Sequence, residues 1–160
     1  MPVSKTFDDL FAIFNTSASW TLTGPPLRVL EDPAETLNLM EFPALVLAYD
    51  WNSTHEIQFH ADSRSHHKIY IAIYLFLGAK GTSLAELHQR ALQPWPVQVA
   101  RILFPHITLG GDIEFLGEGT SEAFLRYRVG FWPWGSVSEQ YWGFRFILAA
   151  NEEGIENFAA

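Results

Sequence analysis

Ile69-Tyr-Ile-Ala-Ile-Tyr-Leu-Phe-Leu77 is the longest apolar run in this chain of 160 residues. Successive side chains of a β-strand point to opposite faces. One face of this strand carries Ile69, Ile71, Ile73, Leu75 and Leu77, and the other carries Tyr70, Ala72, Tyr74 and Phe76. Two apolar faces are typical of a strand in the centre of a sheet, or of one whose second face meets another subunit. The run is too short to cross a bilayer as a helix, so no membrane association is expected.

Hydrophobic alternation predicts further strands on both sides of this run. Ile57 and Phe59 alternate with Glu56 and Gln58, which indicates a strand with one solvated face. The predicted strands lie at about 45–49, 57–61, 69–77, 113–115, 125–131 and 141–148, with a candidate edge strand at 27–30. Between these strands lie segments whose residues favour helices.

Ser83-Leu-Ala-Glu86 is a capping box, whose hydroxyl and carboxylate satisfy free amides at the start of a helix. Pro94-Trp-Pro96 breaks this helix, and a second helical segment is expected to end near Phe104. The capped helix carries an apolar stripe of Leu84, Leu87 and Ala91. This stripe is expected to cover the Ile69 face of the central strand. An earlier amphipathic helix is predicted over about 4–15, with Thr6 as its N-cap.

This order of elements predicts a single α+β domain over residues 1–160. We expect an antiparallel or mixed sheet of about six strands, with an N-terminal helix and one broken helix packed on it. Gly24-Pro-Pro26 and Asp32-Pro33 interrupt regular structure, so an extended arm or loop is expected at about 16–41. The acidic C-terminus after Asn151 is expected to be frayed.

Composition excludes several classes of function. The chain has 10 Lys and Arg against 18 Asp and Glu, and its net charge is −8. It has no stripe of basic residues that could hold a phosphate backbone, so tight nucleic-acid binding is not expected. The chain has no Cys, which excludes disulfides and thiolate metal sites. No nucleophile elbow, Walker loop or dinucleotide fingerprint occurs. We expect no enzymatic activity and no cofactor.

Histidines and carboxylates gather in one short segment. The group comprises His55, Glu56, His60, Asp62, His66 and His67. These residue types bind zinc or iron, but their spacing fits no strict ligand motif. Adjacent residues of a strand, such as His66 and His67, point to opposite faces. A solvated hairpin with polar histidines is therefore favoured over a metal site, and a small His-metal enzyme stays as an alternative.

Aromatic residues make up 15% of the chain, more than a core of this size ordinarily needs. Aromatic side chains are enriched in the buried centres of protein interfaces. The candidate interface residues are Tyr70, Tyr74 and Phe76 on the central strand, and Trp132, Trp134 and Tyr141 further along the chain. The Tyr74 face is expected to meet either the segment after the first helix or, as we favour, a neighbouring subunit. The Trp and Tyr residues could instead stack on a sugar or another planar ligand.

The chain resembles the tail terminator proteins of long-tailed bacteriophages. The resemblance rests on the order of elements: an N-terminal helix, strands ending in Ile69–Leu77, and the helix opened by Ser83-Leu-Ala-Glu86. The resemblance also includes Leu109-Gly-Gly-Asp-Ile113 and the closing strand Tyr141-Trp-Gly-Phe-Arg-Phe146. In total it covers most of residues 5–150. Such proteins are small α+β proteins that form a ring on the end of the tail tube.

The resemblance implies a structural virion protein rather than an enzyme. Its implied partners are further copies of itself in a ring, a hexamer in this family, together with the tail tube protein and the head–tail connector or neck proteins. DNA would pass through the ring without specific binding, as the acidic charge allows. The implied location is the tail or neck of the virion, and the host cytoplasm during assembly. An aromatic-lined carbohydrate- or ligand-binding module is the alternative from another class.

Overall fold

The computed structural model describes residues 3–30, 41–50, 53–62, 64–111, 115–116, 125–134 and 139–155. Its helices are α1 (Val3–Phe14), α2 (Leu84–Ala91) and α3 (Trp95–Leu103), with 3-10 turns at Ser17–Ser19, Phe104–His106 and Leu109–Gly111. Its strands are β1 (Arg28–Leu30), β2 (Ala44–Tyr49), β3 (Glu56–Phe59), β4 (Arg64–Ala79), β5 (Phe115–Leu116), β6 (Arg126–Trp134) and β7 (Glu139–Ile155). The expected α+β class, with an N-terminal helix and a broken helix, is confirmed.

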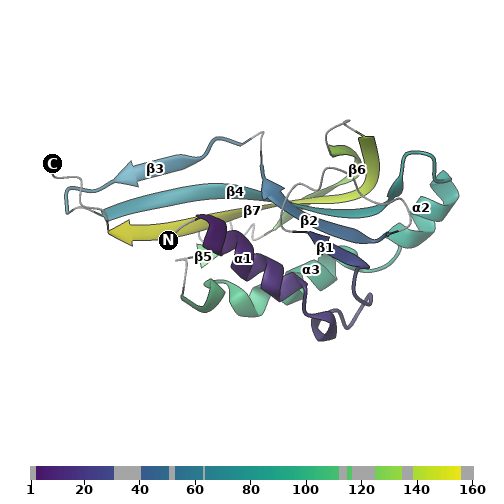
Figure 1. Cartoon of the computed structure of the whole chain (residues 1–160), viewed down its shortest axis with the longest axis horizontal. Helices are drawn as coiled ribbons and strands as arrows, with labels where there is room; N and C mark the ends of the chain where they lie inside the picture. Colours follow the sequence, from purple (N-terminus) through teal and green to yellow (C-terminus); the bar gives the residue numbers. More distant parts are fainter. Residues whose placement is uncertain are drawn as a thin grey trace.

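The strands form one mixed sheet of seven strands in the order β1-β2-β4-β7-β5, with β3 also beside β4 and β6 also beside β7. Among the strands of the described residues, only β1 and β2 pair in parallel. β7 follows β4 along its whole length, from Arg64 opposite Ile155 to Ala79 opposite Tyr141. The two long strands extend beyond the helices as a projecting ribbon, with β3 beside them (Figure 1).

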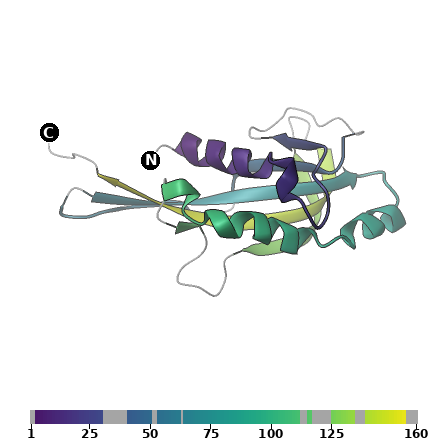
Figure 2. The same ribbon diagram turned by 90° about the horizontal axis from the view of Figure 1, so that it is seen from below.

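The face of the sheet that carries Ile69, Ile71 and Ile73, here called the first face, is covered by helices. Figure 2 shows α1 and α3 lying across it. Its core includes Leu10 and Phe14 of α1, Trp95, Val99 and Leu103 of α3, and the odd-numbered side chains of β4 from Ile69 to Leu77. Periodicity explains this arrangement, because each helix presents an apolar stripe to a strand face that is apolar throughout.

The structure corrects the expected position of the capped helix. Ser83 is the N-cap of α2 as predicted, and its Oγ accepts a hydrogen bond from the amide of Glu86 at 3.2 Å. However, the buried helical residues of the first-face core come from α1 and α3, and α2 contributes only the partly buried Ala91. α2 follows the end of β4 after a tight turn, and its buried Leu87 lies against Gly78. A helix of eight residues is only about 12 Å long and cannot reach back along β4.

The N-terminal helix and the segment after it also differ from expectation. Thr6 lies inside α1 and does not cap it, because the helix already includes Val3. In the expected arm or loop at 16–41, Trp20 and Val29 pack against the first-face core, and residues 31–40 lie outside the described part. Trp20 is buried and its indole Nε1 donates to the carbonyl of Phe14 at 2.9 Å. The candidate strand at 27–30 is present as β1.

The strand that closes the sheet is longer than the sequence suggests. The chain beyond Asn151 was expected to fray, but β7 continues to Ile155 because β4 still offers it a pairing partner at Arg64–Lys68. Residues 156–160 lie outside the described part. The Gly pair of the resemblance forms a turn, with positive φ at Leu109, Gly110 and Gly111, and the Asp112 and Ile113 that follow are not described.

Candidate interaction surfaces

The second face of the sheet, opposite the helices, carries a cluster of aromatic side chains. Tyr74 and Phe76 of β4 stack with ring centroids 5.4 Å apart. Trp134 of β6 lies 5.3 Å from Tyr74, and Tyr141 of β7 lies 5.2 Å from Phe76. β6 brings its tryptophans here because it pairs with β7 and curls over this face of the sheet (Figure 1). The cluster forms a second core with Ala44 and Val46 of β2.

This packing revises the interface expected from sequence. Phe76 and Tyr141 are fully buried within the single chain, and Tyr74 and Trp134 are nearly so. Buried side chains offer no surface to a neighbour, so the Tyr74 face of the central strand is intramolecular core. Trp132 is half-buried, and Tyr70 is half-buried at a separate place, where the Lys68 ammonium lies 5.4 Å from its ring centroid. Sequence alone missed this because it could not show that β6 would fold back onto its own sheet.

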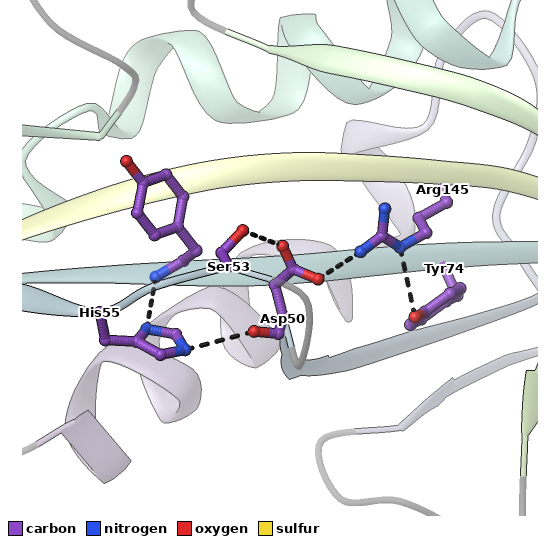
Figure 3. Close-up of polar contacts among 6 residues, drawn as sticks. Asp50, Ser53, His55, Tyr74 and Arg145 are labelled. Atoms are coloured by element: carbon purple, nitrogen blue, oxygen red, sulfur yellow. Dashed lines mark hydrogen bonds and ion pairs between the residues drawn. The ribbon is translucent and has the colours of Figure 1, made fainter.

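Beside the aromatic cluster lies a nearly buried ion pair. The guanidinium of Arg145 on β7 donates to the carboxylate of Asp50, which directly follows β2 (Figure 3). Arg145 Nε also donates to the hydroxyl of Tyr74 at 3.3 Å. The guanidinium carbon lies 5.9 Å from the Tyr74 ring centroid and 5.5 Å from that of Trp132, within the range of cation–π attraction. The pair therefore fixes β7 to the end of β2.

Ser53, His55 and Asp50 lie together but do not form a catalytic triad. Ser53 Oγ donates directly to the Asp50 carboxylate. His55 Nδ1 accepts the backbone N–H of Tyr70 at 3.1 Å, and Nε2 lies 3.2 Å from the Asp50 carbonyl, to which it donates (Figure 3). Both ring nitrogens are thus engaged with the backbone, and neither can take a proton from Ser53. The contacts hold the connection after β2 against β4.

Two hollows that share Arg126, Arg145 and Ile147 lie next to this ion pair. One, of about 300 Å³, is lined by Asp50, Ser53, Tyr70, Arg126, Arg145, Ile147 and Ala149. The other, of about 510 Å³, is lined by Leu125, Arg126, Tyr127, Arg128, Arg145 and Ile147. Three of the chain's ten basic residues line the second hollow. Arg145 is already paired with Asp50, so the exposed Arg126 and Arg128 make the rim of this hollow basic and suited to contact with carboxylates.

The histidine-rich segment of the sequence forms the projecting hairpin of β3 and β4. His60 and His66 contact each other with ring centroids 5.1 Å apart, and His67 Nδ1 lies 3.8 Å from the buried Glu152. Asp62 pairs with Arg64 at 3.4 Å. Within the described ranges, no three His, Asp or Glu side chains are placed to hold a metal ion.

Glu152 of β7 is buried beside Thr6, and its negative charge influences the pKa of Tyr49. Thr6 Oγ1 donates a hydrogen bond to the buried carboxylate of Glu152. The pKa of Tyr49 is raised above its ordinary value by burial and, to a smaller degree, by the negative charge of Glu152.

Two strands expose apolar side chains on the first face. On β6 they are Tyr127, Val129 and Phe131, which are 51%, 48% and 40% exposed. On β3 they are Ile57 and Phe59, which are 54% and 65% exposed. We call these the β6 stripe and the β3 stripe. The alternation that predicted both strands was visible in the sequence, but only the sheet order shows that each stripe lies beyond the cover of the helices.

Comparison with known proteins finds no protein-family model that matches the chain and no curated protein of significantly similar sequence. Among the described helices, none is long and apolar enough to cross a membrane. The two exposed apolar stripes and the hollow beside Arg126 and Arg128 are the candidate surfaces for binding another protein.

Proposed function

We propose that this chain is a structural assembly protein that associates with further copies of itself, and that it acts as a tail terminator of a long-tailed phage. The observation that carries the proposal is the pair of exposed apolar stripes on two different strands. β3 lies on the side of β4 away from β7, and β6 lies on the far side of β7. The stripes therefore occupy opposite edges of the sheet.

Two different surfaces at opposite edges favour head-to-tail association. A contact between unlike surfaces leaves one surface unused at each end, so the assembly closes into a ring when the rotation between copies closes and grows as a filament when it does not. β6 is nine residues long, and a long edge strand with exposed apolar side chains carries a risk of aggregation unless a partner covers it. In the proposed role, a ring of this protein ends the growth of the tail tube and contacts the neck proteins, and DNA passes through it.

The competing proposals have less support. A sugar-binding module would need the aromatic side chains as an open platform, but Trp134 and Tyr141 are buried. A His-metal enzyme would need converging ligands, whereas His55 is engaged with the backbone through both ring nitrogens. Neither alternative accounts for the two stripes.

The test is the mass of the purified protein, measured by light scattering from micromolar to millimolar concentration, together with negative-stain images. A closed ring supports the proposal, and sixfold symmetry supports the terminator reading in particular. A protein that stays monomeric over the whole range, with no particle larger than the monomer in the images, contradicts it.

A further inference from the structure

We propose that the β3 edge of one copy pairs with the β6 edge of the next, so that the sheet continues from subunit to subunit. This inference rests on the proposed self-association and names the two strands that carry it. Within the described residues, β3 pairs only with β4, and β6 pairs only with β7. Each strand therefore has one backbone edge that no described strand occupies.

The directions of the strands make this junction antiparallel. β3 is antiparallel to β4, β4 to β7, and β7 to β6. It follows that β3 and β6 of one molecule run in opposite directions. β3 lies beside residues 65–68 of β4, whereas β6 lies beside the part of β7 that faces residues 72–79 of β4, so a neighbouring copy that keeps the direction of every strand must also be displaced along the strands. A closed ring can hold such a displaced junction when its strands are tilted to the ring axis, as in a β-barrel. The β3 strand of one copy would then meet the β6 strand of its neighbour as an antiparallel pair, with a regular ladder of hydrogen bonds.

The faces of the two strands also match. Opposite residues in a ladder point to the same face, so Ile57 and Phe59, which lie opposite His67 and Ser65, are on the first face. Tyr127 lies opposite Phe146, which places the β6 stripe on the first face as well. A continuous sheet would thus join the two stripes on one side.

Charge on the second face is complementary across the same junction. Glu56 on β3 is exposed and lies opposite Lys68, on the second face. Arg126 and Arg128 on β6 are exposed on that face, opposite Ile147 and Arg145.

We infer the register that sets Ile57 against Val129 and Phe59 against Tyr127, because it covers the two most exposed side chains of the β6 stripe. Glu56 then lies diagonally across from Arg128, within reach of that long side chain.

The absence of cysteine allows a direct test of this contact. A chain carrying Ile57→Cys and Val129→Cys should form intermolecular disulfides under mild oxidation, because facing residues of a ladder satisfy disulfide geometry. A non-reducing gel should show a ladder of linked chains. The matched control pairs Val129→Cys with Gln89→Cys, an exposed position on α2, and should give less than a tenth of the cross-linked product. Equal cross-linking of the control overturns the proposal, and so does a V129C single variant that links efficiently to itself, which would indicate a symmetric contact.

A second experiment blocks one surface at a time. Ile57→Asp and Val129→Asp place a charge in the proposed junction at positions that are exposed in the single chain, so each variant should fold and keep its melting temperature. Each should associate at least tenfold more weakly than the wild type. A one-to-one mixture should give a dimer and nothing larger, because each variant retains one intact surface. Tyr127→Phe serves as the control and should assemble normally.

The outcomes separate this inference from the proposed function. A wild-type protein that forms rings, with I57D and V129D assembling equally well, overturns the β3–β6 junction and leaves self-association standing. A mixture that gives particles larger than a dimer also contradicts the junction. Both proposals are overturned if the wild type is monomeric at every concentration and the variant with the I57C and V129C substitutions does not cross-link.

Discussion

Arg145 donates a hydrogen bond to the carboxylate of Asp50 across 95 residues of sequence, and the two side chains are only 12% and 4% exposed. The pair joins β7 to the end of β2 on the second face of the sheet. Burial makes the contact costly to break from one side only, because the remaining charge would have little access to water. The arrangement also holds Tyr74 and Trp132 beside the guanidinium.

Removing either partner of this pair should destabilise the protein. We expect Asp50→Ala or Arg145→Ala to lower the free energy of unfolding by about 3 kcal/mol, as for other buried pairs that lose one member. The double variant should lose less than the sum of the two single losses. Urea unfolding followed by fluorescence measures all three. Strictly additive losses would show that the two side chains do not interact in solution.

Truncation of the second-face core should affect stability rather than association. Phe76→Ala removes a fully buried ring and should cost about 3–5 kcal/mol. Phe131→Ala removes a ring that is 40% exposed and should cost well under half as much in the monomer. Thermal unfolding of the two variants measures the stability that each loses relative to the wild type. Similar losses for both would contradict the distinction between core and exposed stripe.

By the same reasoning, Tyr74→Glu should fail to fold stably rather than give a folded, assembly-defective monomer.

The close contact between β4 and β7 depends on Gly143. A Cβ atom at this position would lie 2.0 Å from the carbonyl oxygen of Leu75, which is backbone and cannot move aside cheaply. We expect Gly143→Ala to destabilise the protein by about 2 kcal/mol or more through local overpacking. Gly81→Ala is the matched control, since nothing lies within 4 Å of its Cβ position. Both can be compared by urea unfolding, and a Gly143→Ala variant as stable as the control would contradict the pairing.

Added zinc should leave the melting temperature unchanged. His55 is engaged through both ring nitrogens, and Asp62 pairs with Arg64, so these groups of the histidine-rich segment are already used. Differential scanning fluorimetry with and without zinc, together with metal analysis after dialysis, provides the measurement. One equivalent of tightly bound zinc that disappears in a His60→Ala, His66→Ala variant would show a metal site.

Tyr49 should release its phenolic proton at a higher pH than an ordinary tyrosine, whose pKa is about 10. The folded state favours the protonated form, so this contribution to stability is present below the ordinary tyrosine pKa and is lost as the pH rises through the higher native pKa. Absorbance titration at alkaline pH, with Tyr49→Phe as reference, isolates the group. Glu152→Gln should lower the pKa of Tyr49 only in part, because burial is the larger cause. A complete return to the ordinary value would contradict that order of causes.

The sequence alone determined the local elements and the class of fold. The apolar run at Ile69–Leu77 specified a central strand, Ser83 and Glu86 specified the start of α2, and Pro94 specified the break before α3. These features depend on residues close together in the chain, through alternation, capping and the missing amide of proline. The excess of aromatic residues was also visible, but the sequence could not distinguish core from interface.

Only the tertiary structure decided which surfaces are covered. β6 pairs with β7 and folds its tryptophans onto Tyr74 and Phe76, which converts the expected interface into core. The same pairing leaves Tyr127 and Val129 exposed at the sheet edge. The pairing of β4 with both β2 and β7 brings Asp50 to Arg145. Burial and ion pairing depend on contacts between residues far apart in the chain. Strand order determines those contacts, and local sequence patterns contain no information about strand order.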